Sequence, residues 1–197
     1  GHRFHSTGEI SIDGIDDYAD KLRAAHVIVD HAERQDIVRA GAAKAAADAG
    51  LTLVEDEGLV IENAGLTEWP VPLLGRFDEA FLDVPPEVIQ LTARTNQKYF
   101  VCEDAGSKLA NAFVCTANIA ASDGGAAIVD GNRKVLAARL SDAKFFWDRD
   151  LREAKAGMGA WAEGLKSVTF QSQLGSQADR IDRIAALTRE IAPLVGA

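Results

Sequence analysis

The 197-residue sequence contains only two cysteines, Cys102 and Cys115, and a single methionine. The cysteines lie in strand-like runs on either side of the turn EDAGSK. A hairpin would bring them close together, either as a cross-strand disulfide or as two buried free thiols. In a reducing compartment the free thiols are favoured. Neither spacing is that of a metal site, so we predict no metal centre.

Basic residues are fewer than acidic ones, 21 against 30, and the formal net charge is −9. Any contact with nucleic acid must therefore use a local basic patch, because the negative charge of the whole protein repels phosphates. No apolar run approaches the roughly 20 residues that a bilayer span requires, and the N-terminus has no charged-then-apolar signal layout. We predict a cytoplasmic protein without a membrane partner.

Motifs of several enzyme classes are missing. Glycines such as those in SDGGAAIVDGN are not followed by Lys and Ser or Thr, so a phosphate-binding P-loop is excluded. No G-x-S-x-G nucleophile elbow occurs. These absences exclude two common routes to catalysis, and we predict no catalytic residue.

Histidines are few, and they fall into the pairs His2/His5 and His26/His31. Asp30 beside His31 stands at a predicted helix start, where capping explains the carboxylate. His2 and Arg3, in the GHRF start of the chain, belong either to a flexible terminus or to the edge of a pocket. Both interpretations stay open.

Hydrophobic residues make up 47% of the chain, enough for a sizeable core. Helical patterns cover 15–25, 30–50, 86–95 and 181–195, strand patterns cover 26–30, 71–77, 98–104 and 111–120, and 121–132 is predicted as a loop. Asp30 and Glu33 are spaced as a capping box. Helices and strands do not alternate regularly, which predicts an α+β fold with a mixed sheet and flanking helices.

One predicted helix, 131–151, combines an apolar stripe with basic residues. The stripe consists of Leu136, Leu140, Ala143, Trp147 and Leu151, and Phe146 widens it, so we predict that the aromatic side chains are mostly core. Off the stripe lie Arg133, Arg139, Lys144 and Arg149, with three aspartates among them. This face is either solvated and salt-bridged or able to bind phosphates.

Seven segments together resemble the beta subunit of bacterial heterotetrameric glycyl-tRNA synthetase. They run in that family's order over nearly the whole chain, at 1–4, 27–38, 68–85, 96–101, 113–119, 131–151 and 170–184. The chain departs from the pattern at Arg133, where the family usually has an acidic residue, and at Ala137, where it often has a basic one. Arg139 and Lys144 match better.

The resemblance implies a piece of a longer beta subunit. It implies a B3/B4-like α+β domain at 1–152, then a connector and the first helices of a truncated HD-type domain at 153–197. The apolar stripe at 181–195 would then meet domains outside this chain. ATP and magnesium are expected on the alpha subunit, which carries the class II active site, and no cofactor is expected here.

The resemblance also implies a role in glycine–tRNA ligase, a cytoplasmic assembly of two alpha and two beta subunits. Its partners would be tRNA-Gly, the alpha subunit and the other beta-subunit domains. Candidate tRNA contacts are Arg139, Lys144 and the pair Lys98 and Tyr99, which offer a cation and a stacking surface or else form an ordinary strand. An editing-type aminoacyl-tRNA deacylase and a purely structural scaffold are the alternatives.

Overall fold

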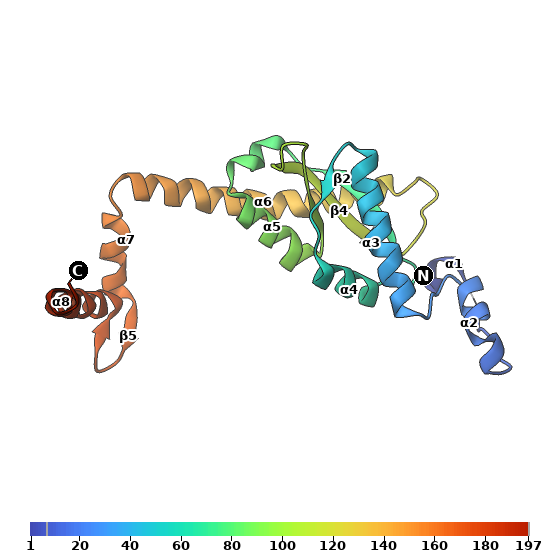
Figure 1. Cartoon of the computed structure of the whole chain (residues 1–197), viewed down its shortest axis with the longest axis horizontal. Helices are drawn as coiled ribbons and strands as arrows, with labels where there is room; N and C mark the ends of the chain where they lie inside the picture. The colour runs from blue at the N-terminus through green and yellow to red at the C-terminus, as the bar shows by residue number, and fades with distance from the viewer. Residues whose placement is uncertain (7, 197) are drawn as a thin grey trace. The chain divides into compact units, whose positions relative to one another are not determined.

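The computed structural model describes residues 1–6 and 8–196 and divides into two compact units, Gly1–Lys144 and Phe145–Ala197 (Figure 1). Helix α6 (Ala126–Lys155) contributes residues to both units. No helix in the described part of the chain is long and apolar enough to cross a membrane. The expected domains 1–152 and 153–197 stay a prediction.

The first unit contains a four-stranded sheet in the order β1-β3-β4-β2. Its strands are β1 (Thr52–Leu53), β2 (Val71–Arg76), β3 (Phe100–Glu103) and β4 (Leu109–Ala117). Each of the three pairings is antiparallel, and β3 and β4 form the predicted hairpin. The α+β class is confirmed, but the sheet has no parallel pairing of the kind that a mixed sheet requires.

Helices flank this sheet. In chain order they are α1 (His2–His5), α2 (Ile15–Ala24), α3 (His31–Asp48), α4 (Glu57–Leu66), the short turn η1 (Glu79–Asp83), α5 (Pro86–Thr92), the π-turn η2 (Ala93–Gln97) and α6. Asp30 caps α3 through the amide of Ala32, as predicted. The predicted capping box is wrong, because Glu33 pairs with Arg23 instead.

Two hydrophobic clusters cover the two faces of the sheet, as the alternation of side chains along a strand requires. Cys102 belongs to the cluster built with α3 and α4, and Cys115 belongs to the cluster that includes Leu136 and Leu140 of α6. Both cysteines are buried free thiols. The prediction of free thiols is therefore confirmed, and the two side chains lie on opposite faces.

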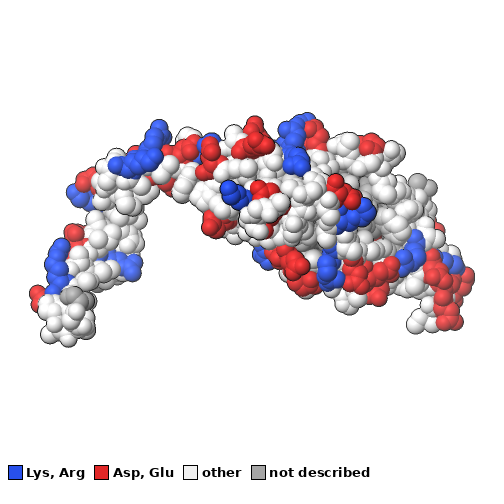
Figure 2. Space-filling model, turned by 45° about the horizontal axis from the view of Figure 1, so that its top comes forward, with Lys and Arg blue, Asp and Glu red and all other residues white. Residues whose placement is uncertain are grey.

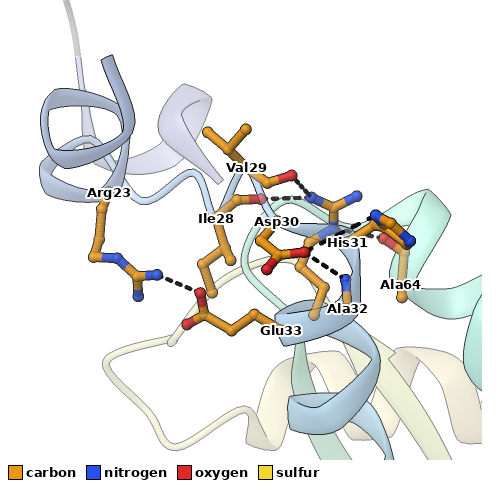
Figure 3. A network of polar contacts seen from close by, with 9 residues as sticks. Arg23, Ile28, Val29, Asp30, His31, Ala32, Glu33 and Ala64 are labelled. Atoms are coloured by element: carbon orange, nitrogen blue, oxygen red, sulfur yellow. Dashed lines mark hydrogen bonds and ion pairs between the residues drawn. The ribbon is translucent and has the colours of Figure 1, made fainter. Parts of the chain in front are cut away.

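Segment 26–30, predicted as a strand, is an extended connector outside the sheet. The amide of Ile28 donates to the carbonyl of Glu68 over 2.9 Å. The carbonyls of Ile28 and Val29, both labelled in Figure 3, instead accept hydrogen bonds from the Arg34 guanidinium. These carbonyls therefore bond to a side chain and not to a neighbouring strand.

The predicted loop 121–132 is also partly wrong, since α6 begins at Ala126. Asp123 accepts hydrogen bonds from the amides of Gly125 and Ala127, both over 2.9 Å. A carboxylate that satisfies these amides lets a helix start directly after two glycines. The first turns of α6 therefore come from residues whose composition resembles a loop.

The second unit contains the end of α6 and the elements α7 (Gly159–Gly164), η3 (Leu165–Ser167), β5 (Thr169–Gln171), β6 (Gly175–Ser176) and α8 (Gln177–Val195). Ser176 and Asp179 form a capping box at the start of α8. The apolar stripe of α8 is exposed, with Ile181, Ile184, Leu187 and Ile191 each 43–59% accessible.

The aromatic residues of α6 do not form the core that the sequence predicts. Leu136 and Leu140 are fully buried, but Phe145 and Phe146 are 62% and 57% exposed. Their rings contact each other edge to face, with centroids 5.5 Å apart. The apolar stripe thus packs along the first half of the helix, and the aromatic half belongs to the second unit.

Candidate functional site

The basic residues at the start of α6 are neutralised within the helix. Asp130 lies 2.6 Å from the guanidinium of Arg133 and 2.7 Å from the ammonium of Lys134. Hydrogen bonds from Lys134 and Arg133 lower the pKa of the Asp130 carboxyl. This end of the helix is the salt-bridged face that the sequence analysis offered as one alternative.

Arg139 is different, because it is exposed and no carboxylate of the described residues lies within ion-pair distance of its guanidinium. Lys144 contacts Asp83 of η1 over 3.3 Å. Residues five apart on an α-helix are separated by about 140° around its axis, so Arg139 and Lys144 do not form one narrow stripe. Figure 2 shows acidic and basic side chains interspersed over the visible surface.

Lys98 and Tyr99 take different environments although they are adjacent. Lys98 has a left-handed backbone (φ 60°) and its ammonium lies 2.8 Å from Glu62. Tyr99 is only 6% exposed and its ring stacks on Phe113, with centroids 5.0 Å apart. Burial raises the Tyr99 pKa to about 12. The expectation of an open stacking surface at Tyr99 is therefore wrong, because the core covers the ring.

His2 and Arg3 lie in the short helix α1. The backbone amide of His2 donates to Glu68 over 3.1 Å, and its ring Nδ1 lies 3.2 Å from the same oxygen. Burial opposes ionisation of Glu68, but these contacts with His2 outweigh it and lower the Glu68 pKa. Arg3 is exposed. The pocket predicted at these two residues stays a prediction.

A histidine stack that the sequence did not predict lies nearby. The rings of His5 and His26 are stacked, with centroids 3.9 Å apart and planes inclined by 22°, and His26 also contacts Trp69. The buried Nδ1 of His26 has no hydrogen-bond partner among the residues that the structure describes. Within the same described ranges, no group of three His, Cys, Asp or Glu side chains could hold a metal ion.

A polar cavity of about 370 Å³ lies where α4, the η2 turn, the end of β4 and the first turns of α6 meet. We call it the amide pocket, because its polar lining consists mainly of Asn63, Gln97, Asn118 and Asn132, together with Thr67 and Thr116. Lys98, Tyr99 and Cys115 complete its polar and sulfur-bearing wall. The amide pocket therefore adjoins two of the predicted tRNA contacts.

Most of these amides are held in place by hydrogen bonds to the backbone. Asn63 donates to the carbonyls of Leu59 and Lys98 over 2.9 and 3.1 Å. Asn118 accepts from the amides of Glu68 and Trp69, both over 2.9 Å. Side chains held in this way are preorganised for a ligand. The sequence analysis missed this pocket, and the only signal that could have indicated it is the Asn within the apolar run GLVIENAGL.

Comparison with known proteins gives one family. The family model described as "Glycyl-tRNA synthetase beta subunit" matches residues 1–197. The chain belongs to this family. It is 57% identical over 197 residues to the glycine–tRNA ligase beta subunit of Paracoccus denitrificans and 53% identical over 197 residues to that of Dinoroseobacter shibae. The protein of the same name from Rhodospirillum centenum is 48% identical over 196 residues.

All of this chain is covered in each of these three matches, but the chain spans only 27–29% of the length of the glycyl-tRNA synthetase beta subunits that it matches. The resemblance stated from the sequence is thus confirmed at the level of the family. These relatives are therefore more than three times as long as this chain.

Proposed function

We propose that this chain is the part of a glycine–tRNA ligase beta subunit that helps to hold tRNA-Gly during ATP-dependent attachment of glycine. The observation that carries the proposal is the family match over the entire chain. In this proposal the alpha subunit binds ATP and magnesium and performs the chemistry. The assembly contains two alpha and two beta subunits and works in the cytoplasm.

Arg139 is the best-supported RNA contact in this chain. It is exposed, and among residues 1–6 and 8–196 no carboxylate competes for its guanidinium. Lys144 and Lys98 already contact Asp83 and Glu62, but exposed ion pairs contribute little and a phosphate can replace one partner. Such contacts would position the RNA on its backbone without reading its sequence.

The test is a titration of the chain with tRNA-Gly and an unrelated tRNA over a series of salt concentrations. Binding should weaken as salt rises, because each neutralised phosphate releases counterions. Arg139→Glu should lower the affinity several-fold and make the salt dependence shallower. Lys108→Glu, at the exposed β3–β4 turn, is the matched control and should change neither.

Two results would contradict the proposal. One is the absence of binding to either tRNA at low salt. The other is an equal loss of affinity in the Arg139 and Lys108 variants, which would indicate a response to net charge alone. Neither would affect membership of the family, which rests on the sequence.

A structural role is the second candidate, and it is favoured by the exposed apolar residues of the second unit. Ile184 and Leu187 of α8 are 52% and 59% exposed, and exposed apolar surface of this kind is typical of a face that meets another protein part. If the role is only structural, Ile184→Ser with Leu187→Ser would reduce aminoacylation by the full enzyme, whereas Arg139→Glu would change neither aminoacylation nor tRNA affinity.

A further inference from the structure

Thr116, one of the residues that line the amide pocket, carries a buried hydroxyl that the fold leaves unused. Oγ1 of Thr116 is shielded from solvent and has no hydrogen-bond partner among the described residues. Its neighbour in the β4–β2 register is Pro72, whose ring carries no donor or acceptor. Since a buried hydroxyl without a partner costs free energy, a lining position of this kind indicates a ligand.

The amides of the pocket also keep hydrogen-bonding capacity. Both donors that Asn63 directs to Leu59 and Lys98 come from Nδ2, so its Oδ1 is left as an acceptor. Asn118 uses Oδ1 for two backbone amides, so its Nδ2 is left as a donor. The pocket thus offers a fixed acceptor and a fixed donor, and the unpaired hydroxyl of Thr116 lies in its wall.

The charge of the lining narrows the class of ligand. Lys98 is the one charged residue among those that line the amide pocket. By contrast, the larger cavity between α3, β1 and α4 is lined by three acidic residues, Glu55, Asp56 and Glu57, and by Arg39. A free amino acid needs a carboxylate for its ammonium group, and none lines the amide pocket. A ligand that joins an uncharged, hydrogen-bonding group to an anion fits the amide pocket better than a free amino acid does.

We propose that the amide pocket binds a nucleoside monophosphate, with the base against the amides and the phosphate at Lys98, where it would replace Glu62 as the partner of the ammonium group. Amide side chains can hydrogen-bond the donor and acceptor pattern of a base edge, and a volume of about 370 Å³ falls within the range of small-ligand sites. Lys98 itself has the left-handed backbone conformation, and it directly follows the π-turn η2. Both features are frequent at functional sites.

The nucleotide can be free or can be an unpaired nucleotide of an RNA, because both present the same base and phosphate. Only the RNA source rests on the proposed function. Single-stranded nucleotides are the usual targets of such pockets, since their bases can leave the stack and expose their edges.

The experiment is a calorimetric titration of the chain with AMP, repeated with GMP, inorganic phosphate and glycine. Thr116→Val should weaken AMP binding by about tenfold, the loss expected for one buried hydrogen bond, without lowering the thermal stability. Lys98→Asn keeps a residue that tolerates the left-handed backbone and should also weaken AMP binding. Thr52→Val and Lys108→Asn, outside the pocket, are the matched controls and should bind AMP like the parent.

The outcomes separate this inference from the proposed function. If Thr116→Val weakens AMP binding, the result supports the pocket. If the same variant also loses affinity for tRNA, the bound nucleotide belongs to an RNA. AMP binding without any tRNA binding supports a free nucleotide and removes the RNA role. Equal AMP affinity in the Thr116→Val variant and the parent, no AMP binding at millimolar concentration, or binding of glycine in its place would each overturn the inference.

Discussion

The hydroxyl of Tyr99 donates a hydrogen bond to Oδ1 of Asn132, which joins the start of the β3–β4 hairpin to the first turns of α6. Asn132 is fixed in turn, because its Nδ2 donates to the carbonyl of Ile128 over 2.8 Å. One tyrosine therefore helps to set the position of the helix that carries Arg139, although its own ring is buried.

We expect Tyr99→Phe to destabilise the protein by about 1–2 kcal/mol, because the acceptor on Asn132 loses its partner. The loss should depend on pH. Since burial raises the folded-state pKa to about 12, above the usual value of 10, the contribution is complete below about pH 10 and disappears as pH rises toward 12. Urea unfolding at pH 8 and pH 10.5 checks both points, with the exposed Tyr18→Phe as control. A difference that grows with pH would contradict the assignment.

We expect both thiols to react slowly in the folded protein. Burial raises the pKa of Cys102 and that of Cys115 from 9.0 to about 11, so little thiolate is present at pH 8. Unfolding should then become easier as pH rises from about 9 to 11. Labelling with a thiol reagent at pH 8, with and without denaturant, measures this protection. A thiol that reacts equally fast in both conditions would be at odds with burial.

Arg34 should matter to stability more than its surface location indicates. Its guanidinium donates to the carbonyls of Ala64, Ile28 and Val29 over 2.8, 2.5 and 2.9 Å, so it joins α3, α4 and the preceding connector (Figure 3). We expect Arg34→Met to cost about 2–3 kcal/mol, since charge-assisted hydrogen bonds are lost and carbonyls are left unpaired. Denaturant unfolding measures it.

Arg39 is the matched control for that measurement. It lies five residues further along α3 and makes ion pairs with Asp36 and Glu57, which are exposed. Exposed pairs contribute little, so Arg39→Met should change the midpoint of unfolding only slightly. If the two variants were equally unstable, the carbonyl contacts of Arg34 would not be the reason.

The same contacts explain which parts of the fold were predictable from the sequence. The β3–β4 hairpin and the cap at Asp30 follow from local patterns, and both are confirmed. Segment 26–30 has the composition of a strand, but strand formation depends on a neighbour to pair with. Its carbonyls bond to Arg34 instead, and a side-chain contact between residues six apart leaves no periodic signal.

The amide pocket was still harder to predict. Its polar residues come from four elements, and each of Asn63, Asn118 and Asn132 has an ordinary explanation when read alone. The helix 131–151 shows a different limit. Its apolar pattern continues past Lys144, but the periodicity does not tell where the packing surface ends, so exposed Phe145 and Phe146 were predicted as core.

Lys144 differs from Arg139 in a way that separates stability from RNA binding. Lys144→Glu would place a carboxylate next to Asp83, so we expect a small loss of thermal stability together with weaker tRNA binding. The exchange Lys144→Glu with Asp83→Lys restores an ion pair of opposite polarity and leaves the net charge unchanged. It should recover the stability but not the tRNA affinity, because the cation has moved from α6 to η1. Recovery of both in a salt-series titration would mean that Lys144 acts only on the fold, and Arg139 would remain the RNA contact of this helix.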